Sequence, residues 1–255
     1  MTAEIERLAQ IVDDAAREHR EIPKLTSAAP LALDDAYAIQ RASVARRLAR
    51  GETRIGVKMG FTSRAKMIQM GCHDVVWGRL TSAMLVADHG TIDLRDYVHP
   101  RVEPEIAFLL REELAGDVTP ARALAAVEAI APALEIIDSR YQKFQFTVPD
   151  VVADNTSSAS LVVGAWCDPH QRFDNLGMLL EFDGRPVQIG SSAAILGHPL
   201  RALAAAARLS AEPLRAGWIV MAGGATAAEA LRPGVYVRNV VQNLGSVGFH
   251  VAKES

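Results

Sequence analysis

The segment HPRVEPEIAF, residues 99–108, places Glu103 and Glu105 two positions apart in a run that otherwise alternates like a β-strand. Side chains on a strand alternate between its two faces, so both carboxylates share a face with Arg101 while the other face is apolar. Neighbours on one face lie about 6.6 Å apart, so two carboxylates can converge on one cation. Pro104 cannot donate a ladder hydrogen bond, so we expect an edge strand or a β-bulge here.

A third acid, Glu135, lies inside the apolar run APALEIIDSR. Its neighbours predict burial, and a buried carboxylate needs a partner charge or a metal ion. Three carboxylates with water in the remaining positions suit a hard octahedral ion such as Mg²⁺ or Mn²⁺. The spacing also fits a simpler arrangement, in which Glu103 and Glu105 are exposed and Glu135 pairs with Arg140. The residues by themselves leave both interpretations open.

Lys58 is the single cation in the apolar, glycine-flanked stretch IGVKMGF, residues 55–61. A lysine in such a strand often protects the edge of a sheet. The alternative is a partly desolvated amine beside a metal site, where it could hold a substrate anion or move a proton.

Helix and strand signals occupy different parts of the chain. Apolar spacing and capping residues predict four helices, near residues 5–15, from Asp34 to Gly51, from Thr119 through Ile130, and from Pro199 to Arg208. Asp183-Gly184 between two apolar runs predicts a β-hairpin. Further short strands are expected at residues 161–164, 218–223, 235–242 and 246–252.

Strands and helices do not alternate regularly, which argues against a doubly wound parallel sheet and favours an α+β fold. We expect a single domain over residues 1–255, in which a helical N-terminal layer, residues 1–52, packs on a β-rich catalytic core, residues 53–255.

The composition is that of an ordinary globular protein, with 49% hydrophobic and 22% charged residues. The formal net charge of -3 gives no basic footprint for nucleic acid. Apolar runs are too short to span a membrane, and the acid-bearing N-terminus lacks the apolar stretch of a signal peptide, so we expect a cytoplasmic location. Cys72 and Cys167 have no metal-site spacing and imply no disulfide framework.

Six motifs occur together in one order along the chain: IGVKMGFTSRAKMIQMG, HPRVEPEIAFLL, ALEIIDSRYQKFQF, VVADNTSSASLVVG, AAILGHPL and AGGATAA. In these motifs, and over residues 19–251, the sequence resembles the 2-keto-4-pentenoate hydratase and 4-oxalocrotonate decarboxylase family of the fumarylacetoacetate hydrolase superfamily. The resemblance implies a fumarylacetoacetase-like mixed β-roll core with flanking helices. It also implies a divalent cation, Mg²⁺ or Mn²⁺, held by three acids that correspond to Glu103, Glu105 and Glu135.

The same resemblance suggests further site residues. Lys58 falls on the family's active-site lysine. Ser160 falls near a polar position that lines the substrate pocket, and Asn155 is expected to do likewise. The loop that begins with Gly223 and Gly224 is expected to face the substrate, although a tight structural turn would explain these glycines equally well.

Three features favour the decarboxylases of this family over its hydratases. EIIDSRYQKFQF and the segments around residues 190–200 and 222–228 are similar to decarboxylases, and Val76 stands where hydratases commonly carry an aspartate. The predicted reaction is metal-dependent decarboxylation of 2-oxohex-3-enedioate to 2-hydroxypenta-2,4-dienoate in aromatic meta-cleavage catabolism. Arg140 or Lys143 is then a candidate to receive the leaving carboxylate, unless both are ordinary surface charges.

Other functions stay open at this point. The main alternative is a 2-hydroxypenta-2,4-dienoate hydratase. A carbon–carbon hydrolase would need a water-activating base for which no motif is evident, and a non-catalytic partner protein would not need to bury these charges. The resemblance further implies an oligomer and a complex with the hydratase that consumes the product.

Overall fold

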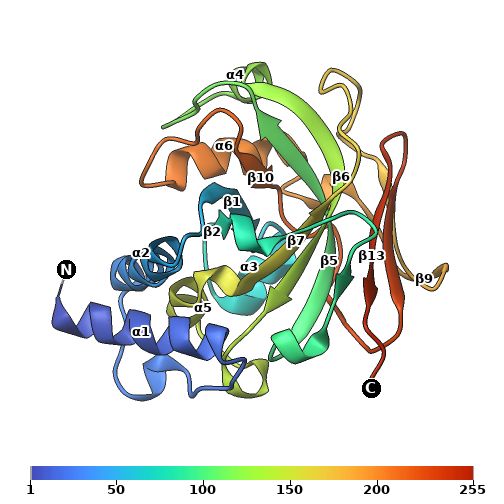
Figure 1. Cartoon of the computed structure of the whole chain (residues 1–255). Coiled ribbons are helices and arrows are strands. Elements are labelled where there is room, and N and C mark those ends of the chain that lie inside the picture. Colours follow the sequence, from blue (N-terminus) through green and yellow to red (C-terminus); the bar gives the residue numbers. More distant parts are fainter. Residues whose placement is uncertain (1, 255) are drawn as a thin grey trace.

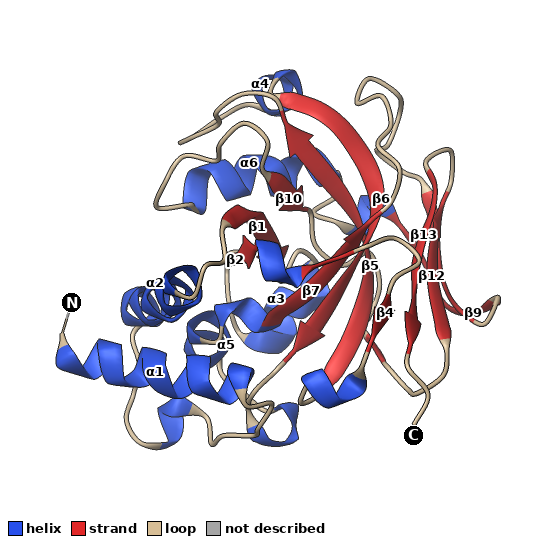
Figure 2. Ribbon diagram, in the orientation of Figure 1, coloured by secondary structure: helices blue, strands red, loops and turns tan. Residues whose placement is uncertain are grey.

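The computed structural model describes residues 2–254, and its helices gather on one side of a curved β core (Figure 2). The predicted ends of the domain at Met1 and Ser255 lie outside the described residues. Six α-helices occur in the described part: α1 (Ala3–Arg17), α2 (Leu33–Ala49), α3 (Arg64–Met70), α4 (Pro120–Ala125), α5 (Val148–Ala153) and α6 (Pro199–Leu209).

Two sheets form the core. The larger has the order β2 (Val76–Thr81), β1 (Arg54–Gly60), β10 (Ile219–Met221), β5 (Pro100–Leu110), β6 (Val127–Asp138), β7 (Ser158–Val163) and β3 (Leu85–Val86), with β11 (Glu229–Ala230) also paired to β5. The smaller has the order β4 (Thr91–Ile92), β13 (Gly245–Val251), β12 (Tyr236–Val241), β8 (Gly177–Phe182) and β9 (Arg185–Ser191). The mixture of sheets and separate helices confirms the α+β prediction.

The long antiparallel pair β5 and β6 is the centre of the molecule, and Figure 1 shows both strands curving along its height. Their register places Glu103 directly opposite Glu135. Side chains of directly opposed residues lie close together on one face of a sheet. The pairing of these two strands therefore brings together acids that are 32 positions apart in the sequence.

The N-terminal helices lie beside the large sheet (Figure 1). Ala9 and Val12 of α1 and Ile39 of α2 belong to one apolar cluster with Val76 of β2 and Val152 of α5. A separate apolar cluster fills the space between the two sheets, with contributions from β5, β6, β8, β12 and β13. The helical layer is therefore fixed to the core by shared apolar packing.

The predicted helix after Thr119 is wrong in its second half. Thr119 caps the helix by accepting from the backbone of Arg122, but α4 ends at Ala125 and β6 begins at Val127. The apolar residues at Val127 and Ile130 fit a helical spacing and a buried strand equally well. Pairing with both β5 and β7 decides the outcome, because β6 is buried between them.

Of the two alternatives expected for the strand that contains Pro104, the bulge is present but the sheet edge is wrong, since β5 pairs with β6 on one side and with β10 and β11 on the other. The carbonyl of Pro104 accepts from Ala225, in the loop that separates β10 from β11. In an antiparallel strand the nitrogen and carbonyl of one residue point to the same side. The missing proline donor therefore faces this interruption, and the strand's bulge lies elsewhere, between Leu109 and Leu110.

The predicted hairpin is confirmed, because Asp183-Gly184 joins β8 to β9 with φ of 52° and 74° at the two turn residues. Two positive φ values in a two-residue loop match the twist of the flanking strands. The strands expected at residues 161–164, 218–223, 235–242 and 246–252 correspond to β7, β10, β12 and β13.

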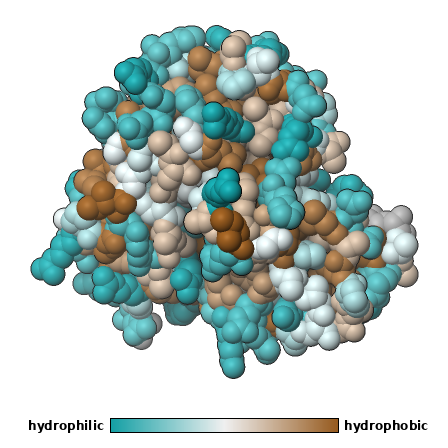
Figure 3. All heavy atoms as spheres, turned by 180° about the vertical axis from the view of Figure 1, so that it is seen from behind, coloured by the Kyte–Doolittle hydropathy of each residue, from teal (hydrophilic) through white to brown (hydrophobic). Residues whose placement is uncertain are grey.

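On the face opposite that of Figure 1, hydrophobic residues are scattered among hydrophilic ones (Figure 3). Large hydrophobic side chains that are exposed include Ile68 on α3 and Ile189 on β9. Among the helices of residues 2–254, none combines the length and the apolar composition needed to cross a bilayer.

Candidate active site

Three glutamates from the β5–β6 pair meet at one point. Glu103, Glu105 and Glu135 each offer a carboxylate oxygen, and these oxygens lie within 4.8 Å of one another. Glu105 and Glu135 have no exposed surface. The register explains the grouping, because Glu103 faces Glu135 across the strands and Glu105 follows on the same side of β5.

Burial makes these carboxylates difficult to ionise. Loss of hydration and the nearby charge of Glu135 raise the pKa of Glu103 to about 7. Burial, followed by the charges of Glu135 and Glu103, raises the pKa of Glu105 well above its usual value. The oxygens Glu105 Oε1 and Glu135 Oε1 are buried and have no hydrogen-bond partner among the described residues. Unsatisfied, clustered carboxylates of this kind fit a bound cation.

Lys58 supplies one positive charge to the cluster. Its side chain is 4% exposed, and Nζ lies 3.0 Å from Glu135 Oε2 while donating to the backbone oxygen of Thr156, also at 3.0 Å. Its strand, β1, lies between β2 and β10, so the edge-protecting interpretation does not hold. Three carboxylates and one ammonium leave a formal charge of -2 (−3 + 1), which one divalent cation would neutralise.

Two glycines allow a loop to approach the carboxylates closely. Gly223 donates its N–H to Glu105 Oε2 over 2.8 Å and has a φ of 104°. A Cβ on Gly223 would lie 2.2 Å from Thr62 Oγ1, and one on Gly224 would lie 2.7 Å from Glu103 Oε2. Position 223 therefore requires glycine, a side chain at position 224 would displace the Glu103 carboxylate, and the loop fixes the orientation of Glu105 through its backbone.

The segment after α5 orients Lys58. Asn155, Thr156 and Ser157 all have positive φ, between 49° and 55°, which costs of order 1–2 kcal/mol for each residue that is not glycine. Asn155 stabilises this conformation by exchanging two side-chain hydrogen bonds with the backbone of Arg79, over 2.7 and 2.8 Å. Asn155 thus positions the Thr156 carbonyl for Lys58, and its own side chain is directed away from the glutamates.

A cavity of about 480 Å³ opens beside the cluster. Glu103 and Lys58 lie in its wall, together with Gly224, the aromatic residues Phe61, Phe144 and Phe146, and the cations Arg101 and Lys66. Ser157 also lines it, and the buried Ser157 Oγ has no hydrogen-bond partner among residues 2–254. Sequence reasoning did not select Arg101, Lys66 or Ser157. Of these three residues, Arg101 alone had a signal in the sequence, because it lies two residues before Glu103 and therefore on the same face of the strand.

Ser160 and Arg140 do not reach this cavity. They line a second one, of about 670 Å³, between the N-terminal helices and the sheet. Ser160 Oγ lies 2.8 Å from the hydroxyl oxygen of Tyr97. Arg140 is held by Asp154, with Nε 2.5 Å from Oδ1 and further bonds to the Asp154 backbone and carboxylate. An arginine engaged in this way is not free for a substrate at the glutamates. Ser160 lines the second cavity and not the first, so the structure places neither predicted substrate-binding residue beside the glutamates.

The comparison with known proteins agrees with the geometry. Residues 55–252 match the sequence profile described as fumarylacetoacetate (FAA) hydrolase C-terminal. The chain belongs to the fumarylacetoacetate hydrolase family. This confirms the resemblance seen in the motifs and the fold that it implied, and all three glutamates, Lys58 and the glycine loop lie inside the matched region.

Within this family the chain is similar to decarboxylases over its whole length. It is 58% identical to a 4-oxalocrotonate decarboxylase from a Pseudomonas species over 253 residues, which are 98% of this chain and 99% of that one. It is 35% identical to a 2-keto-4-pentenoate hydratase from Paraburkholderia xenovorans, covering 95% and 93% of the two chains. A solved 4-oxalocrotonate decarboxylase from Pseudomonas putida, complexed with magnesium and adipate, superposes with a TM-score of 0.95 at 36% identity, covering 98% of both chains.

Proposed function

We propose that this protein is a magnesium-dependent decarboxylase that converts 4-oxalocrotonate (2-oxohex-3-enedioate) to 2-hydroxypenta-2,4-dienoate and CO₂ in the meta-cleavage of aromatic compounds. The observation that carries the proposal is the group of three carboxylates, two of them fully buried, beside a cavity that also holds Lys58 and two further cations. The greater identity to a decarboxylase, 58%, than to a hydratase, 35%, supports the same choice.

Glu103, Glu105 and Glu135 are the proposed ligands of the cation. Three carboxylate donors with room for water suit Mg²⁺, with Mn²⁺ as the second candidate on the same ligand chemistry. The solved relatives contain magnesium with adipate or calcium with acetate. When bound, such a cation would act as a Lewis acid that stabilises negative charge developing on the substrate's carbonyl oxygen.

Lys58 is the proposed proton carrier of the reaction. Its Nζ lies in the cavity wall and contacts both Glu135 and the Thr156 carbonyl, so its position is fixed on two sides. Loss of CO₂ leaves an electron pair at C5 that delocalises onto the C2 oxygen, and the ammonium can stabilise that oxygen or hold a proton near it. The aromatic side chains Phe144 and Phe146 line the same cavity and limit the access of water.

A substrate panel with separate detection of CO₂ and of the dienol tests the proposal. The purified protein should release CO₂ from 2-oxohex-3-enedioate with Mg²⁺ and lose this activity in chelator, and the Mg²⁺ and Mn²⁺ rates should be compared. Consumption of 2-hydroxypenta-2,4-dienoate without CO₂ release would instead identify a hydratase. Inactivity on both compounds with every metal would support a non-catalytic partner.

The hydratase is the second candidate because relatives of that name align with most of the chain. Val76 is against it, since this buried residue packs beside Gly60 and offers no acid at that place in the site. We further propose a cytoplasmic, oligomeric protein that associates with the hydratase acting on its product. Size-exclusion chromatography of the protein alone and mixed with such a hydratase would test the association.

A further inference from the structure

Arg101 is a cation of the cavity that has no role in the proposed reaction. It lies on β5 two residues before Glu103, so its side chain points to the same face of the sheet as the glutamates. It lines the cavity with Glu103 and Lys58 and stands opposite Ile137 of β6. The same strand therefore presents two acids and a cation on one face of the sheet.

The guanidinium of Arg101 is held by an aromatic ring but has no acidic partner among the described residues. Its Cζ lies 4.7 Å from the centre of the Phe144 ring, which restricts the side chain through a cation–π contact. Among the described residues it makes no ion pair and no hydrogen bond of its side chain, whereas Arg140 is bound by Asp154. A half-buried arginine held in place with all its donors free is suited to a carboxylate from outside the chain.

The spacing of Arg101 fits the length of the substrate. Residues 101 and 103 lie about 6.6 Å apart along the strand. A chain of six carbons, with five bonds of about 1.5 Å, spans about 6 Å when extended. A dicarboxylate with one end at the glutamates lies in the cavity that Arg101 also lines, and the relative crystallised with magnesium and adipate contains a six-carbon dicarboxylate.

We propose that Arg101 binds the carboxylate at the far end of the substrate and so makes the site specific for dicarboxylates. This inference rests on the proposed function, because the bound group is the one that the decarboxylase would release. Arg101 takes the place that sequence reasoning gave to Arg140 or Lys143, neither of which lines the cavity. Lys66, the other free cation of the cavity, is exposed on α3, where water screens its charge.

The contact has a particular kinetic consequence. The charge that Arg101 binds leaves the carboxylate as CO₂ forms, so the interaction is weaker in the transition state than in the bound substrate. Interactions of that kind lower KM and do not raise kcat. Arg101 is therefore a specificity-determining residue, and its removal should act on binding.

The first test compares Arg101→Met with the wild type. Loss of a charged hydrogen bond corresponds to roughly a 10- to 100-fold loss of affinity. In the Mg²⁺-loaded protein, calorimetry should show this loss for adipate and almost none for hexanoate, which lacks the second carboxylate. KM for 2-oxohex-3-enedioate should rise by a similar factor, and kcat should not fall, because the lost contact is stronger in the bound substrate than in the transition state. Arg101→Lys should recover part of the affinity, because the charge is retained.

Arg232→Met is the matched control, since Arg232 lies over the Phe182 ring at 5.5 Å and outside the cavity. It should leave adipate binding and KM unchanged. Lys66→Met should have a smaller effect than Arg101→Met. Unchanged discrimination between adipate and hexanoate in Arg101→Met, or a loss in Lys66→Met alone, would overturn the assignment.

The binding experiment separates this inference from the proposed function. Discrimination that depends on Arg101 in a protein without CO₂ release would refute the decarboxylase and retain a dicarboxylate-binding site. CO₂ release with a KM that is unaffected by Arg101→Met would retain the decarboxylase and refute the role of Arg101.

Discussion

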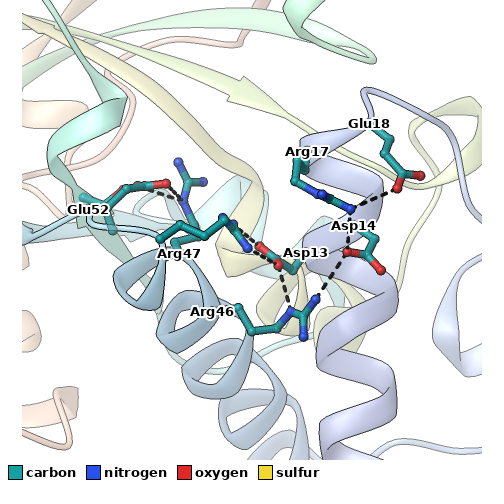
Figure 4. A network of polar contacts seen from close by, with 9 residues as sticks. Asp13, Asp14, Arg17, Glu18, Arg46, Arg47 and Glu52 are labelled. Atoms are coloured by element: carbon teal, nitrogen blue, oxygen red, sulfur yellow. Dashed lines mark hydrogen bonds and ion pairs between the residues drawn. The ribbon is translucent and has the colours of Figure 1, made fainter.

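Two groups of buried charge in this molecule are built in opposite ways. Between α1 and α2, Asp13 is 2% exposed and accepts from Arg46 Nε over 2.8 Å (Figure 4). It also accepts from both terminal nitrogens of Arg50 over 2.7 Å. Burial by itself would raise the pKa of Asp13, but the hydrogen bonds from Arg50 and Arg46 outweigh it, and the pKa is lowered. The chain satisfies this carboxylate completely.

The glutamates of the β5–β6 pair are not satisfied by the chain. One lysine faces three carboxylates, two buried carboxylate oxygens have neither a hydrogen-bond partner nor an ion pair among the described residues, and burial raises the pKa of all three acids. The difference shows that ion pairing between α1 and α2 supports the fold, whereas charge at the glutamates is left for a ligand to complete. Substitutions at the two places should therefore have opposite effects on stability and activity.

Replacing Glu105 with Gln should have the largest effect. We expect metal-dependent turnover to fall by roughly a thousandfold or more, since several kcal/mol of stabilisation by the cation are lost. Without metal, the variant should be as stable as the wild type or more stable, because one of three repelling buried charges is removed. CO₂ release, calorimetric Mg²⁺ binding and thermal unfolding measure the three quantities. Full activity in this variant would refute the metal site.

Magnesium should stabilise the wild type and not Glu105→Gln. At a concentration of 100 times Kd, a ligand that binds the folded state alone adds about 2.7 kcal/mol. For a protein of this size that corresponds to a rise in Tm of roughly 5–10 °C. Equal shifts in both proteins, measured by calorimetry with Mg²⁺ and with chelator, would place the ion elsewhere.

Asp13→Asn should lower stability without affecting the metal site. Loss of charged hydrogen bonds from two arginines should cost about 2 kcal/mol at pH 7, with Mg²⁺ affinity unchanged. A lowered folded pKa gives stability that is present above the unfolded value, about 3.8, and is lost as the pH falls through the folded value. Denaturant unfolding between pH 7 and pH 2 should therefore show the difference between the two proteins shrinking in acid.

Glu4→Gln is the control for this comparison, because the Arg7–Glu4 pair is exposed. Such pairs contribute little, so we expect a change within about 0.5 kcal/mol at every pH. A loss as large as that in Asp13→Asn would show that burial of Asp13 is not the reason for its effect.

Among the test substitutions, as distinct from their controls, Gly224→Ala should have the smallest effect. Its Cβ would lie 2.7 Å from Glu103 Oε2, so the carboxylate must move and Mg²⁺ affinity should fall by about tenfold, or about 1.4 kcal/mol. Gly177→Ala is the matched control, because the nearest atom to its Cβ is at 3.6 Å. If both variants bind Mg²⁺ like the wild type, then the close approach of the loop does not orient Glu103.

The sequence contained local signals for part of the site. Glu103 and Glu105 share a face because side chains alternate on a strand, and the apolar residues around Glu135 and Lys58 predict their burial. These signals are local and survive in any fold that contains the strands. The long motifs then identified the family, and with it the α+β fold, before any contact between distant residues was known.

Only the tertiary structure decided which arginine is paired with an acid and which one faces the cavity. Arg101 and Arg140 both lie within five residues of a glutamate of the site along the sequence, yet Arg140 is bound to Asp154 and Arg101 faces the cavity unpaired. Likewise, Val127 and Ile130 fit a helix until β6 pairs with its two neighbours, and Pro104 suits a central strand only because a loop runs opposite it. Spacing along the chain determines which face a residue takes, whereas its partner depends on contacts between segments that the spacing does not specify.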